Sequence, residues 1–218
     1  MIKSKEDLKF YLAADKFSLE KENFTRPKLT DDVWKFQILL RKTEYYKNAQ
    51  NNLKNKLLFR FFYYKKYKLG LKLGFDIPLN VFGAGLRINH YGNIVINCTA
   101  KIGMWCDIHQ GVNVGENIAK DESSQVPTIG NNVWIGPGAK LFGSIHVGDN
   151  SIIAANAVVN KDVAISSTVA GVPSRVIKSE GTEQMQLAAS VQRMNDFFNK
   201  YPEFAAYYPK QFLNQSEA

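Results

Sequence analysis

The feature that most constrains the fold is a six-residue repeat in the second half of the chain. A period of six matches neither the 3.6-residue period of a helix nor the two-residue alternation of a strand. It is typical of a solenoid with three short strands per coil, in which one aliphatic side chain per strand points inward. We therefore predict a β-solenoid whose inward positions are Ile96, Ile102, Ile108, Val114, Ile129, Ile135, Leu141, Val147, Ile153, Val159 and Ile165.

The repeat is interrupted once. Val114 and Ile129 are fifteen residues apart instead of six, so nine extra residues are inserted at this point. We expect them to form a loop over residues 115–128. Insertions on one face of a repeat protein are commonly part of its binding site.

The rest of the chain differs in character from the repeat. Ser4 with Asp7 three residues later predicts a capped helix start, and Asp31 and Asp32 predict a second helix. We divide the chain into a helical domain over residues 1–73, a β-solenoid domain over 74–178 and a helical or extended tail over 179–218.

The charge of +8 is concentrated in one segment. Between Tyr45 and Phe75 there are eight basic residues and no acidic residue. Such a stripe attracts phosphates, whether on nucleic acid, on a membrane or on a diphosphate-linked substrate. One hypothesis is therefore a non-catalytic basic solenoid that binds nucleic acid, although we do not favour a nucleic-acid partner.

The composition indicates an ordinary globular protein, with 45% hydrophobic and 22% charged residues. No apolar run approaches the roughly 18 to 20 residues of a membrane-spanning helix. The beginning of the sequence, MIKSKEDLKF, is charged and lacks the apolar core of a signal peptide. We expect a cytoplasmic location.

The repeat resembles that of the hexapeptide-repeat acyltransferases over roughly residues 76–178. The resemblance implies a mainly β fold, a left-handed parallel β-helix, preceded here by a small α-helical domain. It further implies an O-acetyltransferase that uses acetyl-CoA as donor and assembles as a homotrimer with active sites between subunits.

His90 is the candidate catalytic residue. The six-residue frame run back from Ile102 through Ile96 places His90 where an aliphatic is expected, and a local rule broken inside a consistent pattern suggests function. The segment HYGNIVINCTAKI, which begins at His90, is similar to a segment of serine acetyltransferases whose leading histidine is the general base. An aspartate about fifteen residues upstream orients that base in the family. Here FDIP supplies Asp76 fourteen residues upstream of His90.

Three residues are candidates for binding the acceptor. His109 follows His90 by nineteen residues, which places it near the same corner one coil later. By the same resemblance, Gln125 stands in the place of an arginine–histidine pair that holds the amino acid in serine acetyltransferases, and Asn89 stands where they have an aspartate before the base. Because an uncharged site suits a sugar hydroxyl, we predict a sugar acceptor in surface-polysaccharide synthesis, with serine O-acetylation in cysteine biosynthesis as the alternative.

The acetyl-CoA site is predicted by resemblance to related sugar acetyltransferases. The stretches WIGPG, AANAVVNKD and AGVPSRVIK correspond to their CoA contacts and supply Gly136, Pro137, Ala155, Asn160, Lys161, Arg175 and Lys178. We expect no metal, because the histidine spacings of 19 and 37 do not resemble a zinc site of this fold. The basic and aromatic segment 54–72 would suit a lipid-linked substrate near a membrane, or alternatively trimer packing.

Overall fold

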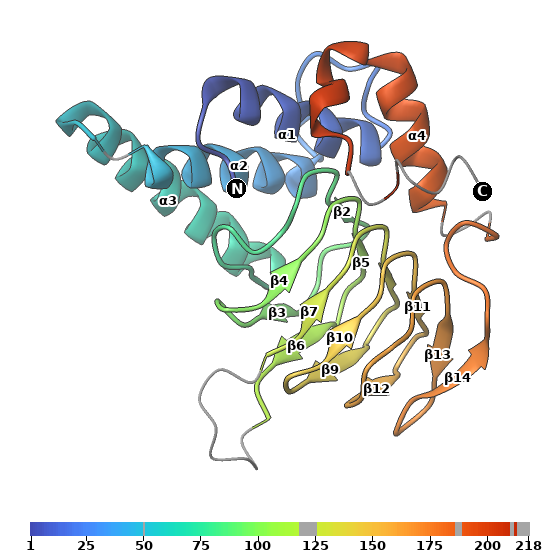
Figure 1. Ribbon diagram of the computed structural model, residues 1–218. Coiled ribbons are helices and arrows are strands. Elements are labelled where there is room, and N and C mark those ends of the chain that lie inside the picture. The colour runs from blue at the N-terminus through green and yellow to red at the C-terminus, as the bar shows by residue number, and fades with distance from the viewer. Residues whose placement is uncertain (50, 118–125, 186–188, 210–211, 213–218) are drawn as a thin grey trace.

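The computed structural model describes residues 1–49, 51–117, 126–185, 189–209 and 212. Figure 1 shows a stack of short strands with the helices gathered at one end of it. The predicted fold is confirmed: the chain forms a left-handed parallel β-helix preceded by helices.

The strands form the three faces of the β-helix. One sheet has five strands, β1 (Phe75–Asp76), β3 (Ile94–Ile96), β6 (Asn113–Gly115), β9 (Lys140–Phe142) and β12 (Val158–Val159). A second has three, β4 (Lys101–Ile102), β7 (Thr128–Ile129) and β10 (His146–Val147). The third has six, β2 (Arg87–Ile88), β5 (Asp107–Ile108), β8 (Trp134–Ile135), β11 (Ile152–Ile153), β13 (Thr168–Ala170) and β14 (Arg175–Lys178). All neighbouring strands pair in parallel except β13 and β14.

The strand register explains the six-residue period. Lys140 pairs with Val158, so one standard coil is three six-residue repeats long. Asn113 pairs with Lys140, so the nine inserted residues lengthen this coil without breaking the register. The predicted inward aliphatics from Ile96 to Val159 are all buried and form the core of the β-helix.

The last predicted inward residue is wrong. Ile165 is 66% exposed, whereas Val163 and Val169 are buried. The cause is a shorter final coil. Ile152 pairs with Thr168, so this coil is two residues shorter than a standard coil. The inward frame therefore shifts by two positions after Val159.

The first coil also departs from the frame, and this changes the place of His90. Arg87 of β2 pairs with Asp107 of β5, so this coil is two residues longer than the standard coil between Lys140 and Val158. Ile88 is 1% exposed and takes the inward position. The expectation that His90 occupies an inward position is wrong: His90 is an exposed corner residue beyond β2.

Among the described residues, three helices precede the β-helix: α1 (Lys5–Ser18), α2 (Asp32–Asn48) and α3 (Leu53–Leu73). Ser4 and Asp7 form the predicted capping box at the start of α1. Helix α3 ends at Gly74, whose φ of 75° is left-handed, and the chain then enters β1 directly. The first coil is thereby attached to the helices without a loop.

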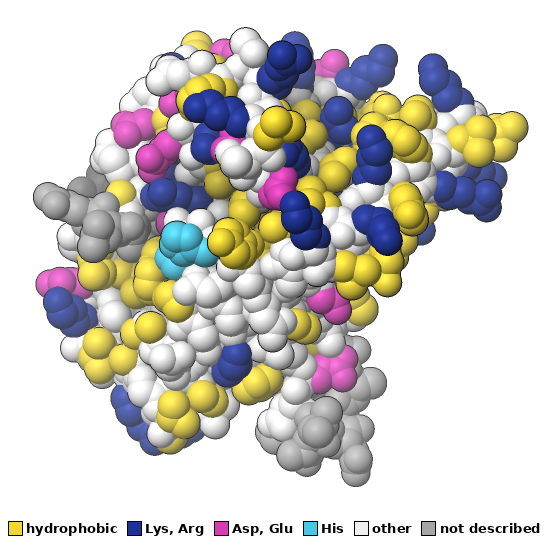
Figure 2. Space-filling view, turned by 180° about the vertical axis from the view of Figure 1, so that it is seen from behind, with side chains coloured by type: hydrophobic (Ala, Val, Ile, Leu, Met, Phe, Trp, Pro, Cys, Tyr) yellow, Lys and Arg dark blue, Asp and Glu magenta, His cyan; other side chains and the backbone are white. Residues whose placement is uncertain are grey.

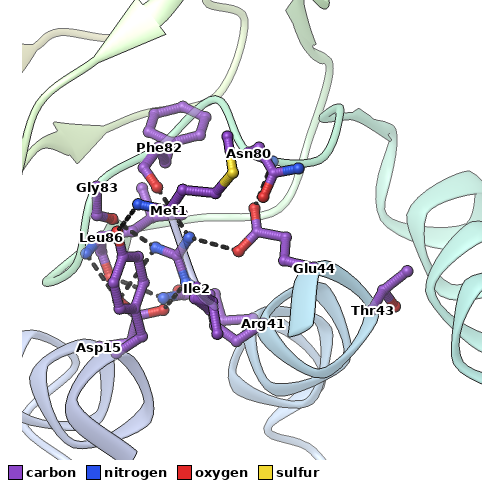
Figure 3. A network of polar contacts seen from close by, with 12 residues as sticks. Met1, Ile2, Asp15, Arg41, Thr43, Glu44, Asn80, Phe82, Gly83 and Leu86 are labelled. Atoms are coloured by element: carbon purple, nitrogen blue, oxygen red, sulfur yellow. Dashed lines mark hydrogen bonds and ion pairs between the residues drawn. The ribbon is translucent and has the colours of Figure 1, made fainter. Parts of the chain in front are cut away.

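A buried polar network joins α1 and α2 to the first coil (Figure 3). The fully buried Arg41 guanidinium binds the carboxylates of Asp15 and Glu44 and donates to the backbone carbonyls of Phe82 and Gly83. A buried charge is tolerated when it is paired and hydrogen-bonded, as here. The network therefore fixes the position of α1 and α2 relative to the β-helix.

The end of the chain returns to the helical region. Helix α4 (Ser190–Lys200) and the 3₁₀ helix η2 (Pro202–Tyr207) lie beside α1 in Figure 1. Phe197 packs against Trp105 of the β-helix at 5.2 Å between ring centroids, and Tyr207 stacks on Phe10 at 4.2 Å. The aromatic tail thus covers the helical end of the molecule.

The register makes a direct prediction for two identical substitutions. Ile135→Ala removes a fully buried side chain and should lower the free energy of unfolding by about 2–5 kcal/mol. Ile165→Ala alters a largely exposed side chain and should change it by less than about 0.5 kcal/mol. Urea unfolding followed by circular dichroism measures both, and equal losses would contradict the shifted frame.

Candidate active site

The six-stranded sheet ends in a corner where predicted site residues from several coils are stacked. At this corner each coil donates a backbone hydrogen bond to a carbonyl of the coil that follows. The pairs are Asn89 with Ile108, His109 with Ile135, Gly136 with Ile153, and Ala154 with Val169. Adjacent coils are about 4.8 Å apart. We call this column of residues the His90 corner. It brings together Asn89, His90, His109, Gly136, Pro137 and Ala155, which are far apart in the sequence.

Two histidines face each other at the first two levels of the His90 corner. The ring centroids of His90 and His109 are 6.2 Å apart, and the rings meet edge to face. His90 is exposed, so its imidazole is accessible to a substrate. The prediction that these two histidines share one corner, which rests on their spacing of about one coil, agrees with this geometry.

His109 is held more tightly than His90. Its ring packs against Trp134 with the centroids 4.8 Å apart, and its Nδ1 lies 3.5 Å from the Asn89 side-chain nitrogen. Burial, followed by the positive charges of His90 and Arg87, lowers the pKa of His109 to about 4. The ring is therefore neutral at neutral pH. In the tautomer that carries its proton on Nε2, Nδ1 can accept a hydrogen bond from the Asn89 amide nitrogen.

Asp76 lies on the five-stranded sheet, whose strand β3 follows His90 in the chain. It is an exposed residue of β1 and pairs in register with Val95 of β3. It lines a hollow under α3 together with Lys66 and Tyr67. Within the described part of the chain, no hydrogen bond or ion pair joins Asp76 to His90. Its role as the residue that orients the base stays a prediction.

The predicted phosphate-binding cations lie toward the far end of the β-helix. Lys161 and Arg175 line one shared hollow next to β12 and β14. Arg175 pairs with Ala170, which immediately follows Val169. The backbone carbonyl of Val169 accepts a hydrogen bond from the backbone N–H of Ala154 in the His90 corner. The cations are thus several coils away from His90 along one side of the molecule. Asn160 and Lys178 are exposed nearby in sequence and do not line this hollow.

A second hollow lies directly beside Asn89. It is lined by Asn89 and Arg87 of the β-helix, by Lys21 and Asp31 from the segment that joins α1 to α2, and by Asp32, the first residue of α2. Hydrogen bonds from Lys21 lower the pKa of Asp31, and hydrogen bonds from Lys72 and Lys35 lower that of Asp32, so both carboxyls are ionised at neutral pH. The hollow thus offers both carboxylates and cations next to the catalytic candidate.

No sequence pattern assigns Asp31 and Asp32 to a site. The pair predicts only the start of a helix, and Asp32 is indeed the first residue of α2. Their proximity to Asn89 depends on how the helices dock on the first coil, which no local pattern encodes. Gln125, the other predicted acceptor residue, lies outside the described residues.

No metal site is evident among the residues that the structure describes. Within these ranges, no group of three or more histidine, cysteine, aspartate or glutamate side chains is arranged to hold an ion. Likewise, no described helix is both long and apolar enough to cross a membrane.

Comparison with known proteins supports the fold and shows similarity to serine acetyltransferases. Residues 127–161 match the family model described as bacterial transferase hexapeptide (six repeats). The serine acetyltransferase of Synechococcus elongatus is 43% identical over 99 residues, which is 45% of this chain and 40% of that protein. The serine acetyltransferase of Mycobacterium tuberculosis is 44% identical over 105 residues, 48% of this chain and 45% of that protein.

Solved structures extend the likeness beyond the repeats. Serine acetyltransferase from Brucella abortus strain S19 superposes with a TM-score of 0.62 and 28% identity, over 81% of this chain and 71% of that chain. The same enzyme in complex with coenzyme A gives a TM-score of 0.62 and 29% identity, over 81% and 70%. The predicted resemblance to hexapeptide-repeat acyltransferases, and to serine acetyltransferases in particular, is confirmed. The match nevertheless spans less than half the length of the two curated relatives.

The low pKa of His109 can be tested directly. The chain has three histidines, and their ring carbon–proton signals can be followed by NMR as the pH is lowered. The His109 signal, identified by its loss in His109→Gln, should stay constant through the ordinary histidine range near 6.5 and shift only near 4. Titration of this signal near 6.5 would contradict a neutral, partly buried ring.

Proposed function

We propose that this protein is an acetyl-CoA-dependent O-acetyltransferase whose acceptor is a hydroxyl, with serine as the best-supported acceptor. The observation that carries the proposal is the His90 corner, which places an accessible imidazole in one column with the residues predicted to contact the acyl donor. The likeness to serine acetyltransferases, one of them solved with coenzyme A, supports the donor.

The donor is proposed to lie along the side of the β-helix that carries the His90 corner. Its diphosphate would meet Lys161 and Arg175, with Asn160 and Lys178 close by, because guanidinium and ammonium groups bind phosphate strongly. Gly136, Pro137 and Ala155 would border the pantetheine arm, since they belong to the corner that carries the two histidines. The thioester would then reach the level of His90 and His109.

His90 is proposed to act as general base. Its imidazole takes the proton from the acceptor hydroxyl as the oxygen attacks the thioester carbonyl. When the tetrahedral intermediate collapses, the carbon–sulfur bond breaks and the imidazolium returns the proton to the departing sulfur. A histidine suits both transfers because its ordinary pKa is close to neutral pH. Asp76 is proposed as the residue that orients His90.

His109 is proposed to serve as a neutral hydrogen-bond donor beside the base. With Asn89 on its Nδ1, the proton on Nε2 is available to an oxygen of the acceptor or of the intermediate. A neutral ring also avoids placing a second positive charge beside the imidazolium that forms on His90. Gln125 is retained as a predicted acceptor contact.

The comparisons favour serine over the sugar that the sequence suggests, and nothing in them supports polysaccharide synthesis. The argument against serine is the loss of charged partners at Asn89 and Gln125. The hollow beside Asn89 answers it in part. Asp31 and Asp32 would exchange ion pairs with Lys21 and Lys72 for the ammonium group of serine, and Arg87 would exchange its pair with Glu20 for the carboxylate. A sugar hydroxyl is the second candidate, and it is favoured by the uncharged amide at Asn89.

Three further features of the proposal rest on resemblance or on composition. We propose a homotrimer with active sites between subunits, a cytoplasmic location, and a division into domains over residues 1–73, 74–178 and 179–218.

The first prediction concerns the base. His90→Gln should lower kcat by about 10²- to 10⁴-fold, with a small change in the KM for acetyl-CoA, as expected for loss of base catalysis. Free thiol release from acetyl-CoA with serine as acceptor measures the rate. His146→Gln alters an exposed histidine on another face and should leave the rate unchanged. Full activity in His90→Gln would contradict the assignment.

The second prediction concerns the acceptor. Serine should be turned over faster than any sugar in a panel of hydroxyl acceptors, and Asp31→Asn should raise the KM for serine by about tenfold or more while the KM for acetyl-CoA stays the same. Asp196→Asn, at an exposed carboxylate of α4 that lines neither this hollow nor the one beside Lys161, is the matched control. Faster turnover of a sugar, with a serine KM that Asp31→Asn does not alter, would establish the second candidate instead.

A further inference from the structure

Helix α3 has two apolar faces, and only one of them is covered. Its partly or fully buried residues recur every three or four positions along one side, at Asn55, Leu58, Phe59, Phe62, Lys66, Leu69, Gly70 and Leu73. This side packs on α2, where Phe62 stacks on Tyr46 at 5.4 Å, and on β1. The outer part of the helix extends away from the rest of the molecule (Figure 1).

The opposite side of α3 carries an exposed apolar stripe. The stripe consists of side chains spaced four, three and seven positions apart, which places them on one side of a helix. These are Leu57, Phe61, Tyr64 and Leu71. They are 56%, 50%, 62% and 63% exposed. At about 100° per residue the stripe lies roughly opposite the packed side. Leu53 and Tyr67, 72% and 52% exposed, widen it.

The stripe is surrounded by positive charge. Helix α3 contains seven basic residues and no acidic residue. Lys66 is turned inward and donates to the backbone carbonyl of Ile77, and Lys72 pairs with Asp32. Lys54, Lys56, Arg60, Lys65 and Lys68 form no ion pair with any residue that the structure describes. Figure 2 shows Lys and Arg side chains intermingled with hydrophobic ones over the projecting helical arm.

We propose that this outer side of α3, residues 53–72, is a docking surface for an anionic lipid membrane. Exposed leucine and aromatic side chains beside lysines are the composition of helices that lie in a membrane interface. Tyrosine rings suit the headgroup region, and long basic side chains extend their charges toward lipid phosphates.

A second copy of α3 is a poor occupant for the same surface. Pairing the stripe with itself would bring the unpaired cations of both helices together, and α3 has no carboxylate to compensate them. An anionic membrane supplies both the apolar layer and the opposite charge, so it satisfies the whole surface. The inference is independent of the reaction that the protein catalyses.

The test is co-sedimentation of the full chain with vesicles of neutral phosphatidylcholine and with vesicles that also contain phosphatidylserine. The protein should sediment with the anionic vesicles only, and raising the salt from about 0.1 M to about 1 M should release it. Lys54→Ser with Lys65→Ser should weaken binding by about tenfold or more, because each basic residue near the surface contributes. Leu57→Ser with Phe61→Ser should weaken it similarly without altering the charge.

Matched controls separate this surface from the overall charge. Lys5→Ser with Lys9→Ser removes the same charge from exposed positions of α1 and should leave binding unchanged. Leu29→Ser, at a 93% exposed leucine outside α3, should do the same. Circular dichroism and the rate of thiol release verify that each variant folds.

Several results would overturn the proposal. These are absence of sedimentation with either vesicle, equal sedimentation with neutral vesicles, and equal losses in the α1 control. A change of oligomeric state in Leu57→Ser with Phe61→Ser, measured by analytical ultracentrifugation, would assign the stripe to a contact between copies instead.

Discussion

The regular stacking of coils is the constraint on which the rest of this structure depends. Each coil repeats its inward aliphatics at the same positions, so backbone hydrogen bonds can join every strand to the next in register. A register fixed in this way also fixes the corners. Residues as far apart in the sequence as His90, His109 and Gly136 are therefore brought into one column, and the proposed catalytic site is a consequence of the same repeat that forms the core.

The repeat could be predicted from the sequence because it uses one type of side chain at one spacing over many coils. The deviations at its two ends could not, because they depend on how long each terminal coil is. From β2 to β5 the coil is two positions longer than the standard coil, and from β11 to β13 it is two positions shorter. These differences move Ile88 inward in place of His90 and leave Ile165 exposed. The broken frame is thus a wrong reason to single out His90. Its role as the base stays a prediction that rests on its similarity to a known segment.

The helical region contributes what a repeat cannot encode. Arg41, buried between Asp15, Glu44 and two carbonyls of the first coil, docks α1 and α2 on the β-helix. That docking carries Asp31 and Asp32 to the edge of the His90 corner and forms the hollow beside Asn89. A contact between segments this distant in the sequence leaves no local pattern, so the sequence suggests an uncharged acceptor site where the structure has carboxylates within reach.

The central claim is that an acyl donor lies along the His90 corner with its sulfur beside His90. A crystal structure of the protein with coenzyme A bound would test this claim most directly. The account predicts that the thiol sulfur lies within about 4 Å of the His90 or His109 ring and that the diphosphate contacts Lys161 or Arg175. Coenzyme A bound along another corner, for example with its thiol beside His146, would contradict it.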